Sequence, residues 1–189
     1  ADGRTVTTRH ILVATGGTPF VPEPFADQGA MTSNEVFLMD HLPGTMLVLG
    51  GGFIACEMAG ILQGLGVSVT QMYRGTQILR GFDGDLQGHV AAALMQQGVT
   101  LEVNTDLAAL ERLPDGRFRA SDTQGRTREF DTVLFASGRR HNTDGLGLAE
   151  AGVIMGDGGE VVVDDYSQTN IPSIFAVGDV TDRIQLTPV

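Results

Sequence analysis

Apolar positions in the middle of the chain change from a continuous run to a helical spacing within a few residues. Residues 46–49 are all apolar, which is typical of a strand buried on both faces of a parallel sheet. Three glycines follow at 50–52, and the next apolar residues recur at helical spacing as far as Leu65. Because residues 67–72 form a second strand-like run, this stretch predicts a βαβ unit with a right-handed crossover.

The same alternation of spacings continues along the chain. Residues 83–97 predict another amphipathic helix, and a third parallel strand is expected at 99–103. The inward face of that helix is expected to hold Leu86, Val90, Ala93 and Leu94. From 107 to 135 short alternating runs are broken by turn residues, which predicts an antiparallel meander. Residues 131–136 predict the strand that returns to the parallel sheet.

The two ends of the chain predict shorter elements. β-branched residues predict a strand over 5–13, the prolines of 18–24 predict an extended linker, and 32–39 predicts one capped helical turn. Further strands are expected at 161–164 and 174–179. Together these elements give an α/β fold, in which a Rossmann-like parallel sheet carries an antiparallel β-meander.

Composition limits the classes of partner. The 189 residues carry 12 basic and 23 acidic side chains, and the net charge of −11 argues against binding to nucleic acid or to an anionic membrane surface. No stretch is apolar enough for a transmembrane helix. The single cysteine, Cys56, excludes a disulfide framework within the chain and a multi-cysteine metal site, and it fits a reducing compartment such as the cytoplasm. The chain starts without methionine and stops at a plausible helix start over 186–189, so we expect it to be a piece of a longer protein.

The glycine turn between the first buried strand and its helix offers a place for a phosphate. Gly50, Gly52 and Ala55 match the G-x-G-x-x-G/A fingerprint of dinucleotide-binding sites. In that fingerprint the first residue makes the turn, the second lets a pyrophosphate approach the backbone, and the third lets helix and strand pack closely. The N–H groups and the dipole at the start of the helix would then hold the anion.

The residues after the second strand favour NADP over NAD. NAD sites usually place Asp or Glu about twenty residues past the glycines, where the carboxylate accepts hydrogen bonds from the ribose 2′-hydroxyl. Here Tyr73 and Arg74 occupy that place and Arg80 follows. Guanidinium groups match the geometry and charge of a 2′-phosphate. The alternative, that both arginines are ordinary solvated residues, stays open at this point.

A second nucleotide site is expected near the end of the chain. The apolar strand predicted at 174–179 ends in Gly178 and Asp179. Sheets of this class bind ligands at the carboxyl ends of their strands, where an acidic side chain commonly meets a ribose or ribityl hydroxyl group. Asp179 is therefore a candidate ligand for a second cofactor.

The chain resembles glutathione reductase, a FAD-dependent pyridine nucleotide-disulfide oxidoreductase, in several motifs that occur in one order. These motifs are GGGFIACE at 50–57, YRG at 73–75, ILRGFD at 78–83, ASGR at 136–139, AVGDVTDR at 176–183 and LTPV at 186–189. The resemblance covers the whole chain but only the middle of the enzyme. It implies that residues 1–17 end a first FAD-domain segment, that 18–141 form the NADP-binding domain, and that 142–189 return into a truncated FAD or central domain.

The resemblance also implies roles for individual residues. Gly50, Gly52 and Ala55 would hold the NADP pyrophosphate. The other implied cofactor contacts are Arg74 and Arg80 at the 2′-phosphate, Arg139 near NADP, Thr15 and Gly16 beside FAD, Asp179 at the ribityl chain, and Thr187 at the flavin pyrimidine edge. The N-terminus of a helix starting at Thr187 would stabilise negative charge near flavin N1.

Two residues of the first helix resemble groups that approach the nicotinamide. Phe53 stands where the family commonly has a tyrosine that covers this pocket, and Glu57 matches a carboxylate that pairs with a lysine outside this chain. Both have simpler alternatives, a core aromatic for Phe53 and an exposed helix glutamate for Glu57. Cys56 is expected to be a small buried hydrophobe, because the redox-active cysteines of the family lie upstream of this chain. The four scattered histidines receive no role, and no metal site is expected.

The implied enzyme is an NADPH-dependent flavoprotein that reduces glutathione disulfide and forms a homodimer. Its hydride would pass from NADPH to FAD and its electrons onward through a dithiol, so the isolated chain is expected to be inactive. Trypanothione reductase and dihydrolipoyl dehydrogenase are the alternatives within the same class of enzyme. A non-catalytic dinucleotide-binding module is the alternative outside it.

Overall fold

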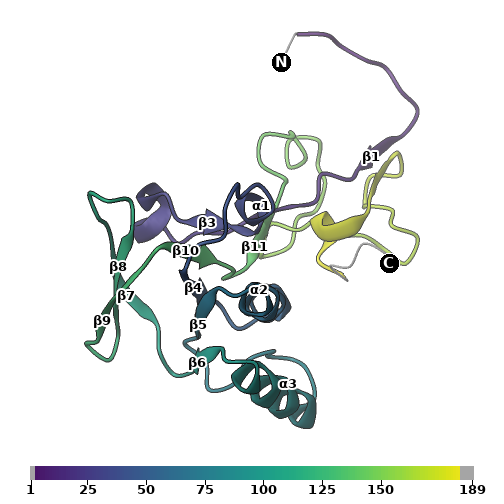
Figure 1. The fold of residues 1–189 in the computed structure, drawn as a ribbon. Coiled ribbons are helices and arrows are strands. Elements are labelled where there is room, and N and C mark those ends of the chain that lie inside the picture. Colours follow the sequence, from purple (N-terminus) through teal and green to yellow (C-terminus); the bar gives the residue numbers. More distant parts are fainter. Residues whose placement is uncertain (1–2, 184–189) are drawn as a thin grey trace. The chain divides into compact units, whose positions relative to one another are not determined.

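Strand β4 (Thr45–Leu49) lies at the centre of a five-stranded parallel sheet, as the unbroken apolar run predicts. In the computed structural model, which describes residues 3–183, the strand order is β3-β10-β4-β5-β6 (Figure 1). The other members are β3 (Met31–Thr32), β5 (Ser68–Met72), β6 (Thr100–Glu102) and β10 (Thr132–Phe135). All neighbours in this sheet pair in parallel, so the predicted α/β fold with a Rossmann-like sheet is confirmed.

Alternate residues of β4 face two separate hydrophobic cores. Met46 and Val48 pack with helix α2 (Phe53–Gly64), while Leu47 and Leu49 pack with the antiparallel meander. Because successive side chains of a strand point to opposite faces, a strand covered on both sides needs an unbroken apolar run. Helices and meander therefore form the outer layers of this part of the chain (Figure 1).

Helix α3 (Gly84–Gln96) follows its prediction in extent but not in every inward position. Leu94 is buried in the core, whereas Leu86 is 45% exposed, so its inward assignment was wrong. Leu86 belongs to the first turn, where its N–H is capped by the Asp83 carboxylate. The neighbouring Gln87 side chain contacts the preceding loop instead, and its amide donates to the carbonyls of Leu79 and Phe82.

The predicted meander is confirmed as a three-stranded antiparallel sheet of β7 (Leu107–Arg112), β8 (Phe118–Asp122) and β9 (Thr127–Phe130). Its apolar face packs in the second core. The prediction of an extended linker over 18–24 was only partly right, because this segment overlaps the short strand β2 (Gly17–Pro19) and the start of the 3₁₀ helix η1 (Glu23–Gln28). The predicted helical turn is α1 (Ser33–Val36), closed by a capping box between Thr32 and Glu35.

The first and last segments of the chain form a third, smaller core. Strand β1 (Ile11–Val13) pairs in parallel with β12 (Ile174–Ala176), which leads into the 3₁₀ helix η2 (Gly178–Thr181), and β11 (Arg139–His141) pairs with β2. The strand expected over 5–13 is confined to its last three residues. The strand expected at 161–164 is absent from the described residues, although Val161 is fully buried and bridges Met155.

Contacts divide the chain into two units. Pro19–Gly138 forms one, which we call the insert unit, and Ala1–Thr18 with Arg139–Val189 forms the other, which we call the terminal unit. The chain passes between them twice, at residues 18–19 and 138–139. The assignment of these regions to NADP and FAD domains stays a prediction.

Candidate functional site

The first glycine of the turn is required by its backbone and by its neighbours. Gly50 has φ of 143°, a conformation that residues with a side chain rarely adopt. A Cβ built here would lie 2.8 Å from the carbonyl carbon of Ala136 and nearer still to its oxygen. Ala55, which is fully buried, has its own Cβ 3.3 Å from the same point. Small residues at both positions let the helix start close against the sheet.

The third glycine leaves room for a ligand. Gly52 is the N-cap of α2, and a Cβ built on it would meet no protein atom within 4 Å. No side chain caps this helix, and its first backbone hydrogen bond runs from the Cys56 N–H to the Gly52 carbonyl at 3.1 Å. N–H groups of the first turn are therefore open to an acceptor from outside, so the residues fit a dinucleotide pyrophosphate.

Two arginines on the loop after β5 have no partner among residues 3–183. Arg74 and Arg80 are both exposed, and neither forms an ion pair or hydrogen bond with the described part of the chain. Four arginines of the meander differ, because Arg117, Arg119, Arg126 and Arg128 are each paired with a carboxylate. Two unpaired cations beside the glycine turn of a chain with net charge −11 fit an anionic ligand such as a 2′-phosphate.

The two residues predicted near the nicotinamide lie one turn apart on α2. Phe53 is half-buried and packs partly against the core, while Glu57 is exposed. Residues four apart share one face of a helix, so these side chains lie on the same side of α2. The described contacts are compatible with both the functional roles and the simpler alternatives, and the two roles stay predictions.

Cys56 is buried beneath the turn, next to a polar residue that the sequence did not single out. Cys56 is 6% exposed, and burial raises the pKa of its thiol. Gln71, fully buried on β5, donates from Nε2 to the Gly50 carbonyl at 3.0 Å and approaches the Cys56 Sγ at 3.5 Å. Its Oε1 has no hydrogen-bond partner among the described residues. A glutamine within the predicted strand at 67–72 was the available signal.

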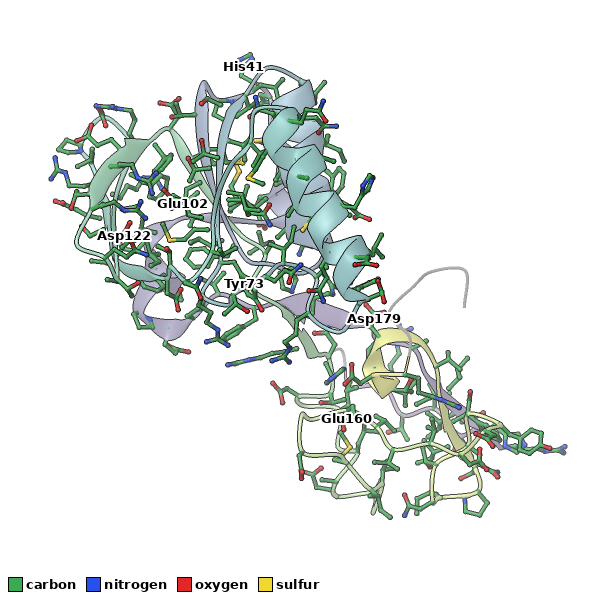
Figure 2. The ribbon with its side chains drawn as sticks, turned by 90° about the horizontal axis from the view of Figure 1, so that it is seen from below. His41, Tyr73, Glu102, Asp122, Glu160 and Asp179 are labelled. Carbon is green, nitrogen blue, oxygen red and sulfur yellow. The ribbon has the colours of Figure 1, made fainter. Side chains whose placement is uncertain are left out.

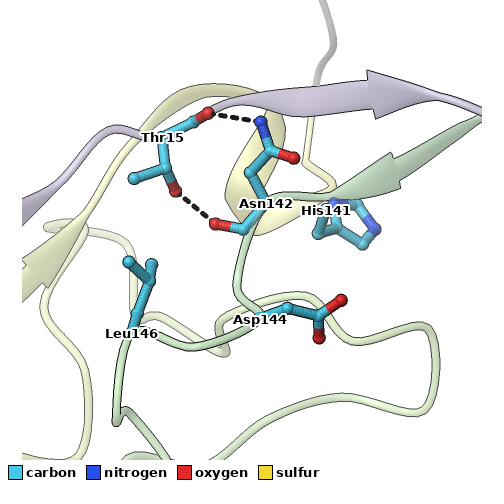
Figure 3. A pocket seen from close by; sticks show the side chains of 5 residues that line it. All are labelled: Thr15, His141, Asn142, Asp144 and Leu146. Carbon is cyan, nitrogen blue, oxygen red and sulfur yellow. Dashed lines mark hydrogen bonds between the residues drawn. The ribbon is translucent and has the colours of Figure 1, made fainter. Parts of the chain in front are cut away.

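Three of the residues predicted to contact FAD follow the carboxyl ends of β1 and β12. Thr15 and Gly16 follow β1, and Asp179 follows β12 within η2. The Thr15 Oγ1 donates to the Asn142 carbonyl at 2.6 Å, and the Asn142 amide donates back to the Thr15 carbonyl at 3.0 Å (Figure 3). An open pocket of about 370 Å³ adjoins them, lined by Thr15, His141, Asn142, Asp144 and Leu146. The pocket lies beside Thr15, at the carboxyl end of β1.

Arg139 lies with the residues predicted for FAD. Its guanidinium donates to the Gly17 carbonyl, and its Nε lies 3.6 Å from the Asp179 carboxylate. The His141 Nδ1 lies 2.7 Å from the Asp179 carbonyl oxygen. His141 and Asn142 were not among the predicted site residues, because their place in the pocket depends on pairing between distant segments. Thr187 lies outside the described residues.

The described residues contain no group of three or more His, Cys, Asp or Glu side chains that could hold a metal ion. Among the same residues, no helix combines the length and apolar character needed to cross a membrane. Figure 2 shows the side chains of this part of the chain.

Comparisons with known proteins agree on one family. The sequence model described as pyridine nucleotide-disulphide oxidoreductase matches residues 1–189. A glutathione reductase of Burkholderia cepacia is 44% identical over 187 residues, which cover 99% of this chain and 41% of that protein. A trypanothione reductase of Trypanosoma congolense is 39% identical over 183 residues, covering 95% and 37%.

Solved structures agree with these relatives. The HOCl-induced flavoprotein disulfide reductase RclA from Escherichia coli superposes with a TM-score of 0.86 at 28% identity, covering 95% of this chain and 41% of that one. The chain thus spans about two fifths of the length of the proteins it matches.

Proposed function

The chain belongs to the pyridine nucleotide-disulphide oxidoreductase family, and from that membership we propose that it is the NADPH-binding part of a flavin-dependent disulfide reductase resembling glutathione reductase. One observation carries the nicotinamide assignment. Arg74 and Arg80 are exposed and unpaired within the described chain, directly after the strand that follows the glycine turn. Guanidinium groups in that position favour a cofactor with a 2′-phosphate.

Residues of the insert unit would hold NADPH at its two anionic groups. Gly52 and the first turn of α2 would bind the pyrophosphate through backbone N–H groups, and Arg74 and Arg80 would bind the 2′-phosphate. Phe53 would cover the nicotinamide, with Glu57 beside it on the same helix face. When bound, NADPH supplies a hydride that FAD accepts, and a dithiol outside this chain takes the electrons onward.

Residues of the terminal unit would hold FAD. Asp179 would accept a hydrogen bond from the ribityl chain, and Thr15 and Gly16 would line its path. Arg139 would orient the Asp179 carboxylate through the 3.6 Å ion pair. Thr187 would contribute a backbone donor at the flavin.

Glutathione disulfide is the proposed substrate of the whole enzyme. The names of the relatives support it, since glutathione reductases match over 98% or more of this chain. Trypanothione reductases match as well, so a trypanothione-type disulfide is the second candidate. The unpaired arginines count against a dihydrolipoyl dehydrogenase type, which normally uses NAD. We further propose that the enzyme is a homodimer, which the family resemblance supports. We also propose that it is cytoplasmic, because a chain with a single, buried cysteine fits a reducing compartment.

Calorimetric titration of the purified chain with NADPH and with NADH tests the proposal. We expect NADPH to bind at least about tenfold more tightly, because hydrogen bonds to charged groups contribute about 1.5–3 kcal/mol each. The variants Arg74→Ala and Arg80→Ala should lose most of this difference by weakening NADPH alone. Arg119→Ala is the matched control, since it removes the same charge from a paired arginine on the meander. Equal affinities of the wild-type chain for the two cofactors would refute the NADP assignment.

A further inference from the structure

Gly51, the middle glycine of the turn, is required by a neighbouring ring rather than by its own backbone. It is absent from the glycines with positive φ, so its conformation would accept a side chain. A Cβ built on Gly51 would nevertheless lie 2.5 Å from both Cγ and Cδ1 of Tyr73. The aromatic ring of Tyr73, labelled in Figure 2, thus packs directly on the Gly51 backbone.

The Tyr73 ring is also in contact with a second glycine. A Cβ on Gly75 would lie 2.5 Å from the ring carbon Cε1 and 2.9 Å from the hydroxyl oxygen. The backbone on both sides of Arg74 is fixed to the end of β6 and the residues that follow it. The Tyr73 N–H donates to the Glu102 carbonyl at 2.8 Å, and the Gly75 carbonyl accepts from the Asn104 N–H at 2.8 Å. The Cα of Arg74 therefore lies between two anchored residues.

A second connection joins Gly51 to the other arginine. The Gly51 carbonyl accepts a hydrogen bond from the Leu79 N–H, and Leu79 directly precedes Arg80. Leu79 is 7% exposed and Ile78 is fully buried, so this part of the loop is held in the core. Gln87 of α3 fixes it further by donating to the Leu79 carbonyl at 3.1 Å.

We propose that Gly51 and Tyr73 are positioning residues that couple the pyrophosphate turn to loop 73–83 and so set the preference for NADPH over NADH. The inference rests on the proposed function, because the loop arginines must bind the 2′-phosphate. Neither residue needs to touch the cofactor. The Gly51 carbonyl accepts a hydrogen bond from the loop, and the absence of a side chain on Gly51 leaves room for the Tyr73 ring. Displacement of either contact would therefore move Arg74 and Arg80 relative to the turn.

A double-mutant cycle tests this coupling. Gly51→Ala, Tyr73→Ala and the double variant are titrated with NADPH and NADH by calorimetry. Each single change should weaken NADPH binding by about tenfold and NADH binding by less than about threefold, and the double variant should bind NADPH no more weakly than the worse single variant. Tyr73→Phe keeps the ring and should retain the wild-type preference.

Gly75→Ala gives a second cycle that leaves the glycine turn untouched. Its new Cβ would meet the Tyr73 ring from another side, so it should lower the NADPH preference, and the double variant with Tyr73→Ala should bind NADPH no more weakly than the worse single variant. This cycle decides the question even if Gly51→Ala fails to fold.

Two results would overturn the coupling while leaving the proposed function intact. One is a wild-type chain that prefers NADPH, with double variants in both cycles whose loss of NADPH affinity equals the product of the two single-variant losses. The other is an equal loss of both nicotinamides in every variant. A wild-type chain without any preference would instead overturn both the coupling and the NADP assignment.

Discussion

Three consecutive glycines in the turn have three different physical reasons. Gly50 needs a positive φ and has no space for a side chain, Gly51 makes room for the Tyr73 ring, and Gly52 borders open space. The fingerprint predicts the first and third of these positions, because their roles follow from the ligand and the turn. The role of Gly51 depends on a residue about twenty positions away and could not be predicted from the motif.

Substitution of the first and third glycines by alanine should separate stability from affinity. Gly50→Ala adds backbone strain of about 1–3 kcal/mol and a clash with Ala136, so we expect the free energy of unfolding to fall by at least about 2 kcal/mol. Gly52→Ala meets no protein atom and should cost less than about 1 kcal/mol, yet it should weaken NADPH binding about tenfold or more. Urea denaturation and calorimetry measure the two effects. A larger loss of stability in Gly52→Ala than in Gly50→Ala would contradict the geometry of the turn.

Cys56 should behave as a buried structural thiol. Burial, with a smaller contribution from the charge of Glu57, raises its pKa above the ordinary value of 9.0, so little thiolate forms at neutral pH. We expect slow reaction with the thiol reagent DTNB in the native chain and prompt reaction in denaturant. The native rate should still be rising with pH at 9. Cys56→Ala should leave NADPH affinity unchanged and cost about 1 kcal/mol of stability, whereas loss of binding would assign the thiol a role in the site.

At the scale of elements, the sequence predicts best where both faces of a segment are covered. The run in β4 and the alternating meander strands match the structure, because each residue's environment follows from strand geometry alone. Leu86 and the segment 161–164 were predicted less well. A helix cap and the turn at Asp164, whose carboxylate accepts from the Tyr166 and Gln168 N–H groups, decide those positions, and hydrophobic spacing does not report either.

The turn between β8 and β9 should make stability depend on acid through Asp122. Burial raises the pKa of this carboxyl group, but hydrogen bonds from Arg126 and Gln124 outweigh it, so the folded pKa lies below the ordinary value of 3.8. The carboxylate therefore contributes stability that is fully present above that value and is lost as the pH falls through the folded pKa.

Thermal unfolding of Asp122→Asn against wild type checks this dependence. The variant should melt at a lower temperature at pH 7, and the difference should shrink as the pH falls below 3.8. Asp115→Asn, at an exposed carboxylate in the preceding turn, is the control, and it should lower the melting temperature less at pH 7. A difference in melting temperature between Asp122→Asn and wild type that stays constant with pH would contradict this role for the carboxylate.

At the scale of the whole chain, the candidate sites combine segments that are distant in sequence. The pairing of β1 with β12 and of β2 with β11 brings Thr15 to Asn142 and His141 to the Asp179 carbonyl. Motifs identified Thr15 and Asp179 one at a time, but the hydrogen bonds that connect Thr15 to Asn142 required the three-dimensional pairing. The unpaired state of Arg74 and Arg80 likewise became visible only in the folded chain.

Hydrogen exchange should report the two units separately. NADPH at about 100 times its Kd should stabilise its site by about 2.7 kcal/mol and slow exchange in residues 50–56 and 73–83. Added FAD should slow exchange in residues 15–16 and 178–181 instead. Protection of both units by NADPH alone would contradict an independent nicotinamide site.

The insert unit begins and ends at a single point. The Phe20 N–H donates to the Gly138 carbonyl at 2.9 Å, and the Ser137 hydroxyl donates to the Phe20 carbonyl at 2.8 Å. A segment whose two ends are hydrogen-bonded to each other can be replaced by another of the same end geometry without a change in the path of the flanking chain. We therefore expect residues 19–138 to be exchangeable as one segment between members of this family. Under the proposed function, such an exchange would change the nicotinamide preference while the flanking segments stay unchanged.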